Sequence, residues 1–138
     1  MRMIFVNLPV ADLQASEGFF TSLGFVKNPA FSDDGTTCVV VEENVVVLLH
    51  SPEKWKGFLR SEPAAPGTTE VVLALSASSR EECDDLRERA LAAGGAEYAP
   101  AVDFGWMYGV SFRDPDGHVW ELSWMDVEAA ARAGGPAA

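Results

Sequence analysis

The sequence predicts an α+β protein in which one strand, helix and three-strand unit (βαβββ) occurs twice. Residues 2–50 and residues 69–124 each begin with an alternating apolar strand, continue into one helix that stops at glycine, and end in β-rich segments. This pattern indicates an internal repeat of one supersecondary unit. Because such units bury their faces best by packing together, we expect a curved, mostly antiparallel eight-stranded sheet around a cleft, with the helices outside.

The first unit is bounded by clear start and stop signals. Its expected elements are a strand at 3–10, a helix at 13–23, a short strand at 25–30, and a hairpin of strands at 37–42 and 45–50. Asp12 is a suitable N-cap, and Gly24 is a C-terminal stop. Pro29 limits the short strand to an edge position. The aromatic pair Phe19-Phe20 is expected in the core.

The second unit follows a proline-containing connector at 51–68 in which one helical turn is expected. Its expected elements are a strand at 70–76, a helix from about Ser79 to Gly94, and strands at about 97–102, 107–113 and 118–124. We expect the two units to form a single domain over residues 1–125, followed by a C-terminal tail at 126–138.

The last expected strand carries an acidic residue through an apolar run. Asp114-Pro115-Asp116-Gly117 is typical of a tight turn that leads into this strand. Side chains of a strand alternate between two faces, so Trp120, Leu122 and Trp124 lie on one side and Glu121 on the other. The large residues suit a helix-covered face, and Glu121 is therefore expected to point into the space at the opposite face. A carboxylate there indicates a function, because an unpaired buried charge is expensive.

Composition excludes several classes of partner. The formal net charge of −11 on 138 residues disfavours binding to nucleic acid or to anionic membranes. The sequence has neither a run of about 18 apolar residues nor a secretory signal, which makes a cytoplasmic location the default expectation. Cys38 and Cys83 lack the close spacing of metal or redox motifs, and both are expected to be buried thiols.

Two segments give the chain a recognisable family likeness. The phrase FRDPDGHVWELSW, together with VNLPVADL, Phe19-Phe20 and Leu23-Gly24-Phe25, resembles the vicinal oxygen chelate superfamily over residues 2–125. That superfamily includes glyoxalase I, bleomycin-resistance proteins and extradiol dioxygenases. The resemblance is specific for fold and implies a small-molecule ligand and a homodimer, but the superfamily hosts several reactions on one scaffold.

The resemblance also implies where a divalent metal ion would be held. The four ligand positions of metal-dependent relatives fall on Phe5, Leu48, Glu70 and Glu121, of which only the two glutamates can ligate. His50 lies two residues beyond Leu48, on the same strand face, and is a candidate third ligand. The cofactor is therefore left open between no metal and a divalent ion bound by His50, Glu70 and Glu121, and the incomplete set argues against glyoxalase I activity.

Three functions follow from these residues. The first is a glyoxalase or bleomycin-resistance-like protein that binds a small, partly apolar molecule in the cleft, with Glu121 as the polar anchor. The second is a metal-dependent lyase, isomerase or dioxygenase that uses His50, Glu70 and Glu121. As a close carboxylate pair, Glu70 and Glu121 are also candidates for general base and acid. The third is non-catalytic sequestration of a drug or metabolite. The expected pocket residues are Phe5, Asn7, Leu48, Trp106 and Tyr108.

Overall fold

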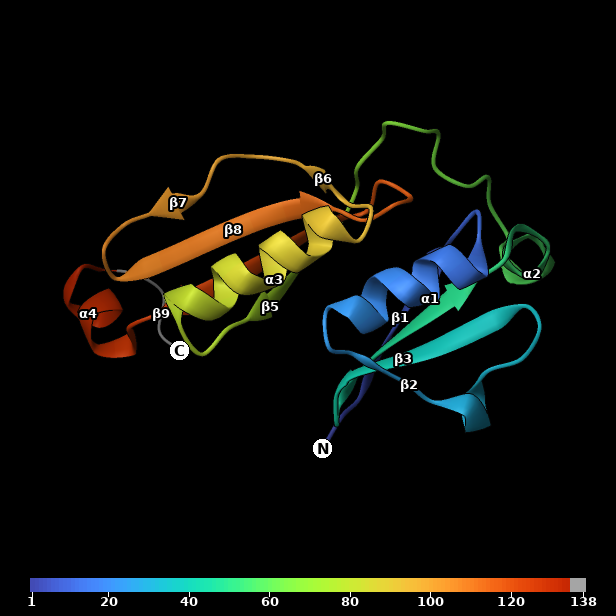
Figure 1. Ribbon diagram of the computed structural model, residues 1–138, viewed down its shortest axis with the longest axis horizontal. Helices are drawn as coiled ribbons and strands as arrows, with labels where there is room; N and C mark the ends of the chain where they lie inside the picture. The colour runs from blue at the N-terminus through green and yellow to red at the C-terminus, as the bar shows by residue number, and fades with distance from the viewer. Residues whose placement is uncertain (135–138) are drawn as a thin grey trace. The chain divides into compact units, whose positions relative to one another are not determined.

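The computed structural model describes residues 1–134 of the chain. The chain separates into two compact units, Met1–Thr68 and a second unit that begins at Thr69. Each unit contains one open sheet of parallel and antiparallel strands with a long helix packed on it, and Figure 1 shows this arrangement in both units. The predicted α+β class and the repeated order of elements are confirmed.

The first unit holds a four-stranded sheet in the order β1-β4-β3-β2. Its elements are β1 Ile4–Pro9, α1 Leu13–Ser22, β2 Val26–Lys27, a 3₁₀ turn η1 at Pro29–Phe31, β3 Thr36–Glu42, β4 Val45–His50 and α2 Pro52–Phe58. β1 runs parallel to β4, and the other pairs are antiparallel. The helical turn expected in the connector is α2, whose first turn is capped by Ser51.

Helix α1 begins where the sequence indicates and covers one face of this sheet. The Asp12 carboxylate accepts a hydrogen bond from the Ala15 amide at 3.1 Å and caps the helix. Phe19 and Phe20 are buried, and so are Val47 and Leu49, which alternate with the residues of the opposite face along β4. Burial of each Phe contributes roughly 1.5–3 kcal/mol, so this packing fixes which face of the sheet α1 covers.

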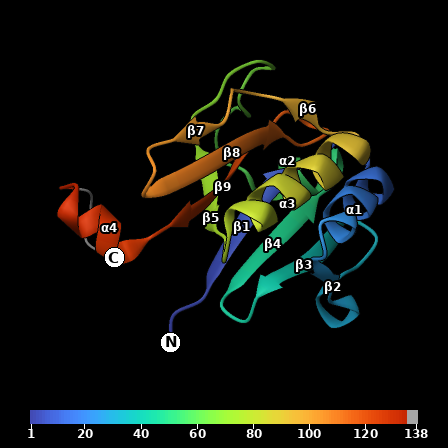
Figure 2. The ribbon, with the colours of Figure 1, turned by 60° about the vertical axis from the view of Figure 1, so that its left-hand side comes forward.

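The second unit holds a sheet in the order β5-β9-β8-β6, and β7 also pairs with β8. Its elements are β5 Val72–Ser76, α3 Arg80–Ala92, β6 Ala96–Glu97, β7 Val102–Asp103, β8 Met107–Arg113, β9 Val119–Met125 and α4 Val127–Arg132. β5 is parallel to β9, as β1 is to β4 in the first unit. Figure 2 shows α3 lying along β8, with β6 and β7 at the far edge of that strand.

Side chains of α3 identify the covered face of the second sheet. The Arg80 guanidinium lies 5.1 Å from the ring centre of Tyr108 and 5.2 Å from that of Trp124. The Tyr108 hydroxyl donates to the Asp84 carboxylate at 2.6 Å. Tyr108 and Trp124 are register partners across β8 and β9, so the even-numbered residues of both strands face α3.

Several boundaries differ from the sequence expectations, among them β2, which covers only Val26–Lys27 of the expected 25–30. β5 begins at Val72, so Glu70 lies before the strand and not in it. The strand expected at 97–102 is two short strands, β6 and β7, because Pro100 lacks the backbone N–H that a continuous ladder would need. The expected tail begins with α4, and its last four residues, 135–138, lie outside the described part of the chain. Within residues 1–134, no helix is long and apolar enough to cross a membrane.

Candidate functional site

Glu121 occupies the middle of β9, on the sheet face turned away from α3. It is flanked by Ser111 of β8 and Ala74 of β5, its register partners on the two sides. The residue is half-buried, and no donor among residues 1–134 reaches its carboxylate. Strand register therefore places Glu121 on the sheet face opposite that of Trp120, as the alternation in the sequence predicts. Both cross-strand neighbours, Ser111 and Ala74, have short side chains.

The turn before β9 fixes this orientation. The Asp114 carboxylate is buried and accepts three hydrogen bonds: from the amides of Asp116 and His118, both at 3.0 Å, and from the Trp120 indole at 3.1 Å. The bond to the indole holds Trp120 on the α3 face, and the next residue must then project from the other face. Burial raises the pKa of Asp114, so these bonds stabilise an ionised group that burial alone disfavours.

Glu70 does not meet Glu121. The side chain opposite Glu121 on β5 is that of Ala74, four residues beyond Glu70, and four residues of strand span about 13 Å. Glu70 is also exposed and precedes the strand. The expected acid–base pair of Glu70 and Glu121 is therefore not assembled in the second unit.

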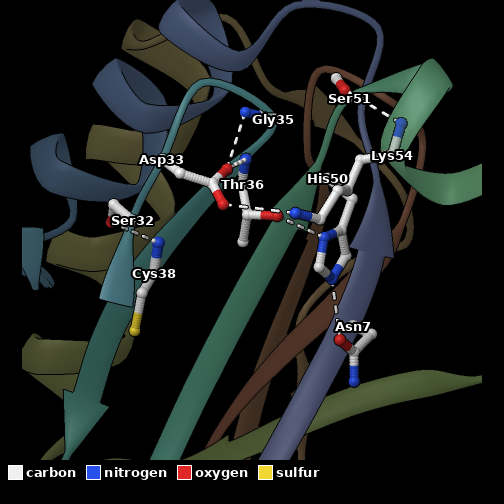
Figure 3. Close-up of polar contacts among 9 residues, drawn as sticks. All are labelled: Asn7, Ser32, Asp33, Gly35, Thr36, Cys38, His50, Ser51 and Lys54. Atoms are coloured by element: carbon white, nitrogen blue, oxygen red, sulfur yellow. Dashed lines mark hydrogen bonds and ion pairs between the residues drawn. The ribbon is translucent and has the colours of Figure 1, made fainter. Parts of the chain in front are cut away.

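The first unit contains a buried hydrogen-bonded chain on the sheet face opposite α1. His50 is 5% exposed, and its Nδ1 lies 2.9 Å from the Thr36 hydroxyl, while its Nε2 lies 2.8 Å from Asn7 Oδ1 (Figure 3). These three residues come from β3, β4 and β1. They are brought together by strand register, in which Thr36 pairs with His50 and Asn7 with Leu48.

The partners of His50 determine its proton positions. An amide oxygen only accepts hydrogen bonds, so Nε2 carries the proton that it donates to Asn7. The Asn7 Nδ2 group donates to the Phe5 carbonyl at 3.3 Å, which agrees with this amide orientation. Nδ1 of a neutral His50 then accepts from the Thr36 hydroxyl. Burial lowers the pKa of His50, and the positive charge of Lys54 lowers it further, against a smaller opposing effect of Asp33.

Two aromatic side chains of α2 complete this cluster. The ring of Phe58 lies 5.0 Å from that of His50, centre to centre, and Trp55 lies 5.1 Å from Phe58 and 6.1 Å from His50. Phe58 is 44% exposed, whereas His50 beneath it is buried. Trp55 and Phe58 thus form an aromatic surface against the His50 ring.

The residues expected to hold a divalent metal ion do not fit that role in the structure. Both ring nitrogens of His50 are engaged by Thr36 and Asn7, so neither lone pair is directed at an open position. Glu70 is separated from Glu121 along the second sheet. Among the described residues, no three His, Cys, Asp or Glu side chains gather closely enough to bind an ion. We therefore derive no reaction step through a metal.

The expected pocket residues do not share one sheet face. Phe5, Asn7 and Leu48 share the sheet face of His50, and Phe5 is 54% exposed. Tyr108 does not share a wall with Glu121, because it lies on the α3 face with its hydroxyl bound to Asp84. Trp106 precedes β8 and lies against Phe104, with the ring centres 5.8 Å apart.

Two features of these surroundings were not anticipated from the sequence. Thr36 joins the His50 chain, although nothing in its local sequence marks it. Arg80 binds Asp103 through two hydrogen bonds of 2.7 and 3.0 Å and the Gly105 carbonyl at 3.0 Å, and so fastens the loop before β8 to the start of α3. The Arg80 guanidinium lowers the pKa of Asp103 to about 2.

Comparisons with known proteins agree with this architecture. A family model described as bleomycin resistance protein-like N-terminal matches residues 2–42. A glyoxalase-related enzyme from Fulvimarina pelagi superposes with a TM-score of 0.76 at 25% identity, over 92% of this chain and 90% of that one. A glyoxalase/bleomycin resistance protein/dioxygenase family enzyme from Burkholderia phytofirmans has a TM-score of 0.76 at 17% identity, over 91% of this chain and 100% of that one.

A third similar structure is the fosfomycin resistance protein FosX from Listeria monocytogenes, with a TM-score of 0.67 at 19% identity, over 93% of this chain and 96% of that one. The two matches below 25% identity support the fold alone. No curated protein sequence matches the chain.

Proposed function

Because the chain resembles the glyoxalase and bleomycin-resistance proteins of the vicinal oxygen chelate superfamily, we propose that it binds a small, partly apolar molecule at the face of its second sheet opposite α3. Glu121 is the polar anchor of this proposal. The observation that carries it is a half-buried carboxylate that has no partner among residues 1–134 and is flanked by Ser111 and Ala74. A ligand group that donates a hydrogen bond or carries positive charge would satisfy it.

The chemistry around Glu121 favours binding over catalysis. General acid–base work on a small molecule needs a second titratable group within hydrogen-bond reach of the ligand, and Glu70 is not placed there. Arg113, on the same face, stacks on Tyr98 at 5.1 Å and forms no ion pair with Glu121. Sequestration of a drug or metabolite thus needs fewer groups than a lyase or dioxygenase reaction.

The test is a binding screen with charged and uncharged versions of one apolar scaffold. Benzylamine, which is cationic at pH 7, and benzyl alcohol, which is neutral, are titrated into the protein by NMR, with bleomycin and fosfomycin as larger probes. We expect the cationic compound to bind at β9 and to weaken about tenfold or more in Glu121→Gln, because a charge-assisted hydrogen bond is lost. Equal binding to both proteins, or no binding of benzylamine at β9, would overturn the proposal.

A homodimer is part of the same proposal. Among the described residues β1 pairs only with β4, and β5 only with β9, so β1 and β5 are edge strands with one unpaired side each. Apolar side chains are exposed along or beside these edges, including Ile4 and Phe5 at β1 and Val71 and Val72 at β5. Exposed apolar strand edges favour a covering partner, and a second copy of the chain is the partner we propose.

A cytoplasmic location likewise stays a prediction.

A further inference from the structure

A second polar group, Asn7, lies on the face of the first sheet opposite α1 and is held in place by a buried neighbour. Asn7 is exposed, yet its Oδ1 is bound by the buried His50 at 2.8 Å. His50 is in turn bound by Thr36 at 2.9 Å, on the ring nitrogen that faces away from Asn7. An exposed amide normally exchanges its O and N positions by rotation about its last bond. Here the Phe5 carbonyl, which can only accept, holds Nδ2 on its side, and His50 donates to the oxygen that this orientation leaves.

This orientation determines what Asn7 can offer. Its oxygen is used by His50, and its Nδ2 group makes one long hydrogen bond, of 3.3 Å, to the Phe5 carbonyl. An amide nitrogen has two N–H groups, and no other acceptor among residues 1–134 reaches this one. Asn7 therefore presents a hydrogen-bond donor, and not an acceptor, to anything that approaches the sheet.

We propose that Asn7 is a ligand-binding residue, and that His50 is the positioning residue that makes it a donor. The ligand group it would take is a neutral acceptor oxygen, such as an amide or ketone carbonyl, attached to an aromatic or aliphatic group. That apolar part would pack on Trp55 and Phe58, whose rings surround His50. The site lies within residues 1–68 and stands whether or not Glu121 binds a ligand.

Charge near this cluster favours a neutral ligand. A depression on the Thr36 side of His50 is lined by Asp33, Asp34, Gly35, Ser51, Glu53 and Lys54, and so carries three acids and one base. Lys54 is already paired with Asp33 at 3.3 Å, and the unbalanced acids disfavour an anion. A cation is disfavoured because Asn7 presents N–H groups to it. A neutral carbonyl compound is neither repelled by the acids nor in need of an acceptor on Asn7.

The experiment compares two probes that differ only in the acceptor. Acetanilide carries a phenyl ring and a carbonyl oxygen, and N-ethylaniline has the same skeleton with a methylene in place of the carbonyl. Each is titrated into ¹⁵N-labelled full-length protein while the Asn7 side-chain amide and the Trp55 indole resonances are followed. Both probes should move the Trp55 signal. Only acetanilide should move the Asn7 signal, and it should bind about twofold to tenfold more tightly, the ratio that one neutral hydrogen bond supplies.

Three variants separate the roles of the residues. Asn7→Asp keeps an oxygen for His50 but removes the donor, and should abolish the preference for acetanilide. His50→Gln retains a side-chain N–H toward Asn7 and should preserve part of the preference, whereas His50→Leu should lose it. Glu88→Gln is the matched control, because it changes an exposed charge on α3 in the other unit and should leave the preference unchanged.

Each outcome bears on a distinct claim. An Asn7 resonance that does not respond to saturating acetanilide, or an Asn7→Asp protein that still prefers acetanilide, overturns the assignment of Asn7. A folded His50→Leu protein with the full preference overturns the positioning role of His50. If His50→Leu does not fold, as judged by its amide spectrum, loss of the preference in folded His50→Gln overturns that role instead. Binding of benzylamine at Glu121 tests the proposed function separately, and neither result substitutes for the other.

Discussion

The carboxylate of Asp114 accepts a hydrogen bond from the indole of Trp120 over 3.1 Å, and both side chains are buried. This bond ties the turn to the strand that carries Glu121 and sets the face from which Glu121 projects. The same carboxylate binds two backbone amides of the turn, so one side chain orders the segment from residue 114 to residue 120.

Replacing Asp114 by Ala should destabilise the protein. Three donors lose this acceptor, among them the buried indole N–H of Trp120, and the loss of its hydrogen bond costs about 1–3 kcal/mol of unfolding free energy. Chemical denaturation monitored by Trp fluorescence measures this. Asp34→Ala, at an exposed position, is the control and should change stability by no more than about 0.5 kcal/mol. Equal stabilities of the two variants would contradict the role given to Asp114.

The Arg80–Asp103 pair should weaken in acid. The pKa of Asp103 is lowered to about 2 from the ordinary 3.8, chiefly by its hydrogen bonds with Arg80. A carboxyl whose pKa is lower in the folded state stabilises the fold above its unfolded value of 3.8, and that contribution is lost as the pH falls through about 2. Wild type should therefore lose its stability advantage over Asp103→Asn between about pH 4 and about pH 2. A difference that does not change with pH across this interval would refute the prediction.

Removal of metal should leave the protein unchanged. His50 donates to Asn7 and accepts from Thr36, so it has no lone pair to offer an ion without breaking this chain. We expect EDTA to alter neither the melting temperature nor the binding of benzylamine. One equivalent of tightly bound metal that disappears in both His50→Ala and Glu121→Gln would instead support the metal-dependent alternative.

Charges placed at the two strand edges should dissociate the proposed homodimer. Ile4 and Val71 are 55% and 60% exposed, so a Lys at either position should be tolerated by the isolated chain. We expect the double variant Ile4→Lys, Val71→Lys to raise the dimer dissociation constant at least about tenfold, measured by light scattering over a dilution series. A wild-type chain that is monomeric at every concentration would contradict the dimer.

Local signals in the sequence predicted most of the fold. Asp12 caps α1, Ser79 caps α3, and the alternation after Gly117 places Glu121 opposite Trp120, as expected. These features depend on neighbours within a few residues, and short-range propensity and periodicity determine them.

The details of the candidate site depend on pairing between distant strands. Thr36 meets His50 because β3 and β4 pair in one register, and Asn7 meets it only because β1 adds to the other side of β4. Tyr108 lies under α3 because its register partner is Trp124. Glu70 lies outside β5, although the alternating segment that ends at Ser76 includes it. Side-chain period alone does not set these registers.

The central claim is that Glu121 binds the ligand through its negative charge. The direct measurement is the dissociation constant of benzylamine for wild type and for Glu121→Gln, determined by NMR titration at pH 7 and low salt. We predict saturable binding that shifts resonances of β9 and weakens about tenfold or more in the variant. Binding of equal strength in the two proteins, or shifts confined to residues away from β9, would contradict it.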